Sequence, residues 1–222
     1  MALKVISQTP PQTSQERTTE SGDIKQLSKQ LMEMQGVYDA AIKKVCEKLE
    51  AINCKFQDQF DHSPIRFVET RLKTAESIYK KLKKRGCPVS PESARKNLSD
   101  IAGIRVVCYF IGDAYAIADK LLQESDIILI EKKDYIEKPK ANGYRSLHLV
   151  VQLPVVQSGK AELVPVEIQI RTMMMDLWAS LDYQLKYKKE QAVDPQIIQC
   201  LKECAEKIAE LDNRVQDICR KI

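Results

Sequence analysis

Two acidic residues, Asp100 and Glu167, have the chemistry that a phosphate-transfer site requires. Asp100 lies in the segment LSDIAGIR, and Glu167 lies in the segment VEIQIR. Transfer of a phosphoryl-type group needs neutralised phosphate charge and an oriented, deprotonated nucleophile. Asp100 suits Mg²⁺, a hard cation that prefers carboxylate oxygen. Glu167 suits a base that accepts the proton of an attacking hydroxyl and shares the metal, a role that contributes roughly 10² to 10⁴ in rate.

The segment PKANGYRSLH combines a turn with groups that bind nucleotides. Asn142 and Gly143 are a strong turn signal, and Gly143 permits a positive φ. Tyr144, directly after the glycine, could lie flat against a purine base. Donors for phosphate stand within a few residues, at Lys140, Arg145 and His148. Because the sequence holds no Walker-type loop, GxGxxG, nucleophile elbow or HExxH motif, cationic side chains would have to hold the phosphates of a nucleotide.

Cationic side chains also recur at helical spacing after the turn DHSPI. Pro64 suits the first turn of a helix, and Gly86 and Pro88 suit its end, which predicts a helix over residues 64–85. Its apolar stripe is Leu72, Ala75, Tyr79 and Leu82. The opposite face carries Lys73, Ser77, Lys81 and Lys84, at steps of four, four and three. These groups could follow a triphosphate, although the stripe alone favours an ordinary solvated face.

Alternation in three predicted strands separates an apolar face from a face with functional side chains. In the last strand, Glu167, Gln169 and Arg171 lie opposite valines and isoleucines. His148 and Arg105 have the same position in two earlier strands. Alternation alone favours a half-exposed antiparallel sheet with a solvated side. Solvated strand faces favour Thr, Lys and Ser, so the gathering of Arg, His, Glu and Gln indicates the floor of a ligand site.

The pattern along the chain predicts a central domain between two long helices. Residues 1–22 are predicted as a disordered tail, 23–60 as an N-terminal helix, 61–190 as the domain and 191–222 as a C-terminal helix. Within the domain, strands are predicted at 104–110, 126–132, 146–153 and 163–171, and helices at 113–123 and 173–187. The last helix, predicted from residue 195, carries a heptad stripe from Ile197 to Ile218. This stripe suits packing on its own domain or oligomerisation, and both alternatives stay open.

Composition restricts the classes of function. The 222 residues are 44% hydrophobic and 30% charged, an ordinary globular balance. A net charge of +4 is too small for duplex nucleic-acid binding as the main activity. Seven scattered cysteines without a Cys-x-x-Cys pair favour a reduced, cytoplasmic protein. No apolar run approaches the roughly 20 residues of a membrane span, and the first residues lack the apolar stretch of a signal peptide.

Four segments together resemble the synthetase domain of the Rel/Spo alarmone enzymes, above all the stand-alone small alarmone synthetases. They are, in order, DHSPIRFVETRLKTAESI, SDIAGIRVVCYF, DYIEKPKANGYRSLHLVV and VEIQIRTMMMDLWA, and the resemblance covers about residues 61–188. It implies an α+β fold, with a mixed, mainly antiparallel sheet flanked by helices and related to nucleotidyltransferases. It also implies an enzyme that transfers the pyrophosphate of ATP to the ribose 3′-hydroxyl of GTP or GDP and releases AMP.

The resemblance further implies a role for each residue of the candidate site. The adenine of ATP would be clamped by Arg71 and Arg105, and its phosphates held by Lys73, Ser77 and Lys81. The cofactor Mg²⁺ would be bound by Asp100 and Glu167, and Glu167 would activate the 3′-hydroxyl for attack on the β-phosphorus. The acceptor nucleotide would stack on Tyr144 and contact Lys140, Asn142, His148 and Gln169.

Three features depart from the family pattern. The family's metal-dependent hydrolase half has no counterpart, so degradation of the product is not expected. The tetrad at residues 131–134, Glu-Lys-Lys-Asp, mixes features of the GDP and GTP versions, which leaves the acceptor open. Related tetrameric synthetases use lysines on an N-terminal helix to bind alarmone between subunits, but Cys46 and Glu50 stand here, with Glu69 at a further contact. Since a carboxylate repels a pentaphosphate, activation by alarmone is expected to be weak or absent.

Two other functions fit parts of the sequence. A regulatory protein that binds single-stranded RNA or alarmone with little catalysis would use the basic run at residues 80–85. A toxin-like relative would modify adenosine nucleotides or tRNA ends, because Tyr144 can stack on any purine. Besides ATP and GTP or GDP, the partners that the sequence suggests are therefore single-stranded RNA and further copies of the chain in a homotetramer.

Overall fold

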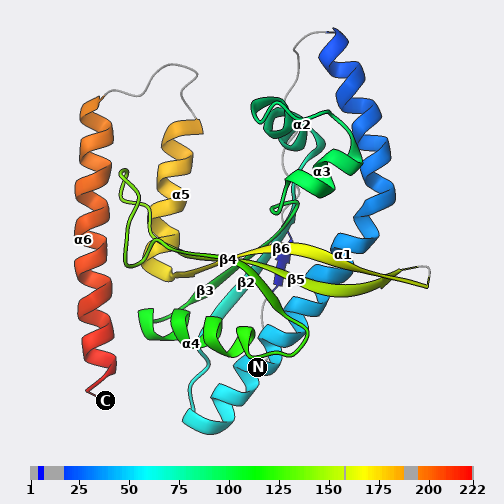
Figure 1. The fold of residues 1–222 in the computed structure, drawn as a ribbon. Helices are drawn as coiled ribbons and strands as arrows, with labels where there is room; N and C mark the ends of the chain where they lie inside the picture. Colours follow the sequence, from blue (N-terminus) through cyan, green and yellow to red (C-terminus); the bar gives the residue numbers. More distant parts are fainter. Residues whose placement is uncertain (1–4, 8–17, 158, 188–194, 222) are drawn as a thin grey trace.

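The computed structural model describes residues 5–7, 18–157, 159–187 and 195–221, which form a sheet flanked by helices (Figure 1). In this part of the chain the strands are β1 (Val5–Ser7), β2 (Ile65–Leu72), β3 (Ala102–Cys108), β4 (Ile128–Asp134), β5 (Leu147–Gln157) and β6 (Lys160–Thr172). Their order in the sheet is β1-β2-β3-β6-β5-β4. The pairs β2–β3, β5–β6 and β4–β5 are antiparallel, while β1–β2 and β3–β6 are parallel. The α+β class and the mixed, mainly antiparallel sheet are confirmed.

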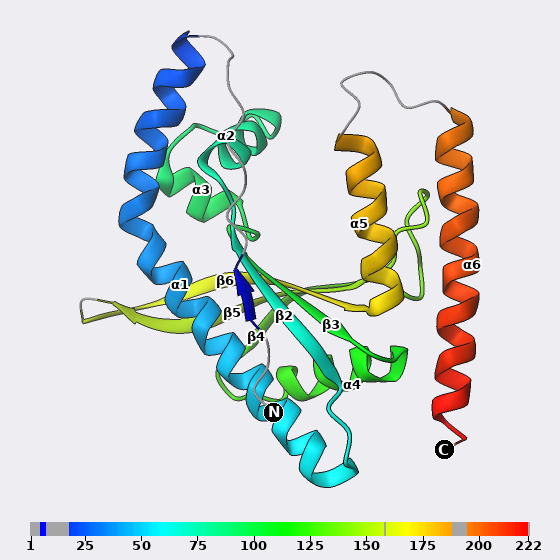
Figure 2. The ribbon, with the colours of Figure 1, turned by 180° about the vertical axis from the view of Figure 1, so that it is seen from behind.

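Helices α1 (Thr18–Phe60) and α4 (Ile111–Leu122) both pack on β3, β5 and β6 and touch each other, so they cover one face of the sheet (Figures 1 and 2). Their apolar stripes meet the inward side chains of the strands. Leu49 of α1, Ile117 of α4 and Ile168 of β6 are all 0% exposed. Burial of each such side chain contributes roughly 1.5–3 kcal/mol. The core therefore lies on this face, which leaves the opposite face of the sheet for polar side chains.

The helix predicted over residues 64–85 is wrong in its first half. Residues Ile65–Leu72 form β2, and the helix that follows, α2, covers only Ala75–Lys84. Thr74 begins α2, because its side chain accepts a hydrogen bond from the backbone N of Ser77 at 3.2 Å. A run rich in β-branched and aromatic residues here gains a full ladder to β3, which local helical spacing cannot show. Arg71 consequently lies on a strand, and Lys73 precedes the helix whose face it was predicted to share.

Other differences concern short elements and ends. Helix α3 (Pro91–Asn97) was not predicted, although Ser90 at its N-cap and Pro91 in its first turn are typical start signals. Strand β1 and the first turn of α1 lie inside residues 1–22, which were predicted as a disordered tail. The rest of that tail lies outside the described residues. Strands β5 and β6 extend past their predicted ends and meet at the turn of Gly159, whose φ is +76°.

Two helices, α5 (Met173–Tyr187) and α6 (Pro195–Cys219), follow the sheet and pack on each other. Helix α6 buries Ala205, Ala209 and Asp212 and leaves Leu211 and Ile218 exposed. The buried face is not the predicted heptad stripe itself, whose residues are half-buried (Ile197, Leu201, Ile208 and Val215) or exposed (Cys204, Leu211 and Ile218). No helix of the described residues has the length and apolar character needed to cross a membrane.

Candidate active site

The polar face of the sheet gathers side chains from three neighbouring strands. The parallel pairing of β3 with β6 places Arg105 beside Gln169. The antiparallel pairing of β5 with β6 places His148 on the other side of Gln169. Glu167 stands two residues earlier in β6, whereas Ile168 between them is 0% exposed. The two faces predicted from alternation are confirmed for these strands.

A pocket on this face is lined by paired residues from three strands. They are Glu69 and Arg71 of β2, Gly103 and Arg105 of β3, and Glu167 and Gln169 of β6. Gly103 pairs with Arg71 across the ladder. A Cβ added at Gly103 would lie 3.2 Å from Nε of Arg71, which is tighter than normal packing. The glycine therefore gives the Arg71 side chain room along the pocket.

Arg105 is held by carboxylates from two elements. Its Nη1 lies 2.8 Å from Oε2 of Glu69 and 3.5 Å from Oδ1 of Asp176 at the start of α5. Burial and the nearby charge of Arg171 lower the pKa of Arg105, while Asp176 and Glu69 raise it. Glu69, which sequence reasoning placed at an effector contact, is thus a neighbour of the expected adenine clamp.

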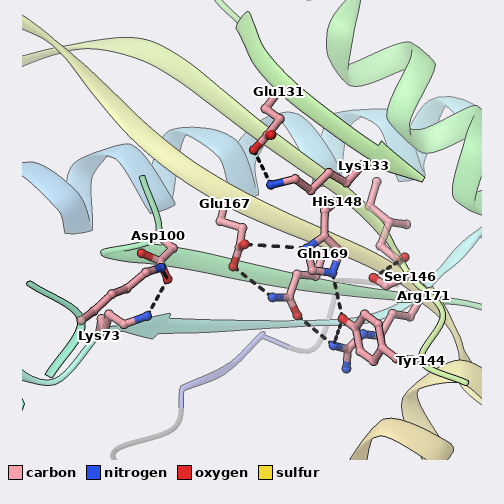
Figure 3. A network of polar contacts seen from close by, with 12 residues as sticks. Lys73, Asp100, Glu131, Lys133, Tyr144, Ser146, His148, Glu167, Gln169 and Arg171 are labelled. Atoms are coloured by element: carbon pink, nitrogen blue, oxygen red, sulfur yellow. Dashed lines mark hydrogen bonds and ion pairs between the residues drawn. The ribbon is translucent and has the colours of Figure 1, made fainter. Parts of the chain in front are cut away.

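Asp100 meets two lysines at the end of the pocket near α2. Nζ of Lys73 lies 2.5 Å from Oδ2 of Asp100 (Figure 3). Nζ of Lys81 lies 2.6 Å from the same oxygen. Burial opposes ionisation of Asp100, but the hydrogen bonds and charges of Lys73 and Lys81 outweigh it, and the pKa of Asp100 is lowered. The carboxylate is therefore ionised at neutral pH. Ser77 lies in the first turn of α2, where its Oγ accepts a hydrogen bond from Oγ1 of Thr74 at 2.9 Å.

The second oxygen of Asp100 has the properties of a metal ligand. Oδ1 is buried and has no hydrogen-bond partner, although buried polar atoms are nearly always paired. The charge of Asp100 also reaches Glu167, whose pKa it raises. Mg²⁺ in nucleotide sites typically takes one or two carboxylates and completes its shell with phosphate and water. The described residues hold no cluster of three or more metal-ligating side chains. Asp100 and Glu167 would be the two carboxylates of an ion of this kind.

Glu167 is held by its neighbours in an ionised state. Oε1 lies 3.7 Å from Nδ1 of His148, and Oε2 accepts a hydrogen bond from Nε2 of Gln169 at 3.0 Å (Figure 3). Burial raises the pKa of Glu167, but the contacts with His148 and Gln169 prevail and the pKa is lowered. The arrangement therefore presents a carboxylate that can accept a proton from a hydroxyl group.

The turn before β5 positions Tyr144 beside this carboxylate. Oδ1 of Asn142 accepts a hydrogen bond from the backbone N of Tyr144 at 3.2 Å, and Gly143 has a φ of +88°. Oη of Tyr144 then lies 2.8 Å from Nε2 of His148. His148 thus contacts both Tyr144 and Glu167, which places the aromatic ring and the base on one face (Figure 3).

Lys140, Tyr135 and Tyr144 stack at the outer side of this turn. Nζ of Lys140 lies 4.6 Å from the ring centroid of Tyr135 and 4.9 Å from that of Tyr144. The side chain of Lys140 is exposed, so solvent reaches the cation that lies over the two rings.

Sequence reasoning missed two further residues of the cluster. Arg171 was placed on the polar face but received no role, and Asp176 was not considered. Nη2 of Arg171 donates to Oη of Tyr144 at 2.6 Å and to Oε1 of Gln169 at 2.9 Å. Nη1 of Arg171 lies 3.2 Å from Oδ1 of Asp176. The alternation in β6 could have identified Arg171, whereas Asp176 stands in the next helix and gives no periodic signal.

Comparisons with known proteins agree with this geometry. The family model described as "Region found in RelA / SpoT proteins" matches residues 70–192. The chain is 39% identical over 186 residues to GTP pyrophosphokinase YwaC of Bacillus subtilis, covering 84% of this chain and 89% of the relative. It is similar to the crystal structure of small alarmone synthetase 1 from Bacillus subtilis bound to its product pppGpp, with a TM-score of 0.80 and 32% identity over 87% of this chain and 98% of that one. A structure of the same synthetase bound to AMPCPP matches with a TM-score of 0.74 and 28% identity, over 87% of this chain and 98% of that one.

The matched region includes the turn that carries Tyr144 and every residue that lines the pocket except Glu69, so the likeness in sequence extends to the candidate site itself. The chain therefore belongs to the RelA/SpoT synthetase family, within its group of small alarmone synthetases.

Proposed function

We propose that the chain is a GTP pyrophosphokinase that transfers the pyrophosphate of ATP to the ribose 3′-hydroxyl of GTP or GDP and releases AMP. The observation that carries this proposal is the position of Glu167. This ionised carboxylate contacts His148 and lies between Tyr144 on one side and Asp100 with its two lysines on the other. The relative whose crystal structures hold AMPCPP and pppGpp has the same fold. One face of the sheet thus offers a donor side, a base and an acceptor side.

The donor side is assigned to the residues around the pocket. We assign the adenine of ATP to Arg71 and Arg105, which line the pocket from adjacent strands. We assign its phosphates to Lys73, Ser77 and Lys81, which lie before and along α2. Lys73 and Lys81 are paired with Asp100, so binding of phosphates would exchange one anion for another at these lysines. Asp100 and Glu167 would hold Mg²⁺, which supplies charge neutralisation at the phosphates.

The acceptor side is assigned to the turn and to β5 and β6. We assign the guanine ring to Tyr144 and polar contacts of the acceptor to Lys140, Asn142, His148 and Gln169. Glu167 then takes the proton of the 3′-hydroxyl while that oxygen bonds to the β-phosphorus. The bond from the β-phosphorus to the oxygen that bridges it to the α-phosphorus breaks, and AMP leaves with that oxygen.

The tetrad at residues 131–134 leaves the choice between GTP and GDP open, but the contacts of its residues suggest which of them can reach the acceptor. Asp134 accepts hydrogen bonds from Oη of Tyr115 at 3.0 Å and from the backbone N of Ile136 at 2.9 Å, so it shapes the turn. Lys133 pairs with Glu131 at 2.7 Å and lies opposite His148 in the ladder. We propose that Lys133 is the tetrad residue that reaches the acceptor phosphates.

The remaining proposals concern partners and location. On α5, Leu177, Leu181 and Leu185 share a face and are 51%, 48% and 45% exposed. Contiguous exposed apolar surface of this kind marks interfaces, so we propose a homo-oligomer, a tetramer as in related synthetases.

All seven cysteines are free, which fits a cytoplasmic protein. RNA binding by residues 80–85 is less favoured, because Lys80 pairs with Glu76 and Lys81 with Asp100.

The test of the function is a transfer assay with γ-labelled ATP, Mg²⁺ and each guanine nucleotide in turn. Label is expected in guanosine tetraphosphate or pentaphosphate together with release of AMP, and chelation of Mg²⁺ should stop both. Glu167→Gln should reduce transfer by roughly 10² to 10⁴ while ATP analogue and GDP still bind. Glu162→Gln is the matched control, because this carboxylate lies on the same strand but pairs with Arg95. Near wild-type transfer by Glu167→Gln would contradict the mechanism.

A further inference from the structure

Arg171 closes a ring of polar contacts around the proposed base. One arm runs from Arg171 to Oε1 of Gln169 at 2.9 Å and from Nε2 of Gln169 to Glu167 at 3.0 Å. The other arm runs from Arg171 to Oη of Tyr144 at 2.6 Å, then to His148 at 2.8 Å and to Glu167 at 3.7 Å. Arg171 has only donors, so it fixes which end of the Gln169 amide faces Glu167. A single buried cation therefore orients both the acceptor-side ring and the base.

Asp176 connects this ring to the donor side. Its Oδ1 is shared between Nη1 of Arg171 at 3.2 Å and Nη1 of Arg105 at 3.5 Å. Arg171 is 5% exposed, and the side chain of Asp176 is 17% exposed, so water screens these contacts only weakly. The Nε atoms of Arg105 and Arg171 are both buried without a hydrogen-bond partner. The two guanidinium groups thus share the carboxylate of Asp176, which forms the longer of the two ion pairs of Arg105, and each keeps a buried N–H without a partner.

We propose that Asp176 and Arg171 are a positioning pair that couples the donor and acceptor nucleotide sites. When a donor purine draws Arg105 onto its ring, the carboxylate of Asp176 is left to Arg171 alone. Arg171 then holds Tyr144 and Gln169 more firmly, and the acceptor binds to a site that is already ordered. By linkage, a bound acceptor strengthens donor binding by the same factor. The inference rests on the proposed function, because it takes Arg105 as a donor contact and Tyr144 as an acceptor contact.

The coupling is measured by calorimetry of AMPCPP binding to the whole protein, with and without saturating GDP and with Mg²⁺ present. In the wild type, GDP is expected to tighten AMPCPP binding by about fivefold or more, the usual lower range of coupling between sites. In Asp176→Asn this factor should fall to near one, because a neutral amide offers less to the two cations. Asp176→Glu, which keeps the charge, should retain part of the coupling.

Glu69→Gln is the matched control, since Glu69 contacts the same Nη1 of Arg105 from β2. It should change the affinity for AMPCPP but preserve the coupling factor. If Asp176→Asn does not fold, Arg171→Lys tests the same bridge, because one ammonium group cannot span Asp176, Tyr144 and Gln169 together.

The outcomes separate the two proposals. Three results would each overturn the coupling role. The first is a coupling factor near one in the wild type, and the second is an unchanged factor in Asp176→Asn or in its substitute Arg171→Lys. The third is an equal loss of the coupling factor in Glu69→Gln. Failure of the wild type to bind AMPCPP at all would instead remove the proposed donor site.

Discussion

Gly143 offers a quantitative test of how the acceptor turn is positioned. Its φ is +88°, a region that costs a residue with a side chain about 1–2 kcal/mol. A Cβ added at Gly143 would also lie 2.4 Å from Cβ of Ala205 in α6. Carbon atoms pack at roughly 3.5–4.0 Å, so the turn or the helix must move by about 1 Å.

The turn is expected to yield, because α6 is fixed by buried contacts. Oγ1 of Thr172 donates to Oδ2 of Asp212 at 2.6 Å, and Nε1 of Trp178 donates to the carbonyl of Leu201 at 3.0 Å. Movement of the turn displaces Tyr144. Since a misplacement of about 1 Å costs about 10²-fold, Gly143→Ala should lower kcat/KM for the acceptor by about 10²-fold. The affinity for AMPCPP in the absence of acceptor should be unchanged.

Steady-state kinetics with the acceptor varied and calorimetry with AMPCPP make this measurement. Ala205→Gly in the Gly143→Ala background removes the colliding atom and should restore most acceptor efficiency, at a cost of about 1 kcal/mol for glycine in a helix. Gly159→Ala is the control, because its φ is +76° and no atom lies within 4 Å of the added Cβ. It should lose stability but keep its kinetics. Unchanged acceptor efficiency in Gly143→Ala, or no rescue by Ala205→Gly, would refute the reasoning.

Two further predictions concern α6 and α5. Burial raises the pKa of Asp212, and this effect outweighs the hydrogen bond from Thr172 and the charge of Arg145, which lower it. Because the pKa is raised in the folded state, the protein loses stability as the pH rises through that pKa. Asp212→Asn keeps an oxygen that accepts the hydrogen bond of Thr172, and it should raise the Tm at pH 7 by about 2–4 °C for each kcal/mol of stability gained. The gain should disappear below the unfolded-state pKa of aspartate, about 3.9. A lower Tm of Asp212→Asn at pH 7, measured by thermal unfolding, would contradict this prediction. Leu181→Glu should shift the mass measured by light scattering toward that of the monomer. The control Glu206→Gln, at an exposed position of α6, should leave the mass unchanged. An unchanged mass of Leu181→Glu would exclude the α5 face as an interface.

The sequence alone identified three of the strands that carry the site, β3, β5 and β6, and the face on which their side chains lie, but not β2. Alternation is a local property, so it correctly predicts that Glu167, Gln169 and His148 lie on one face of the sheet. The segment around Asn142 and Gly143 likewise encoded its own turn, because a positive φ requires glycine at that position.

Only the tertiary structure decided the partners of those side chains. Residues Ile65–Leu72 have helical spacing but gain more from the ladder with β3, so Arg71 moved from a helix face to the pocket. The sharing of Asp176 between Arg105 and Arg171 joins β3, β6 and α5, which no periodic pattern connects. Local spacing determines which way a side chain points, whereas the packing of distant segments determines what it meets.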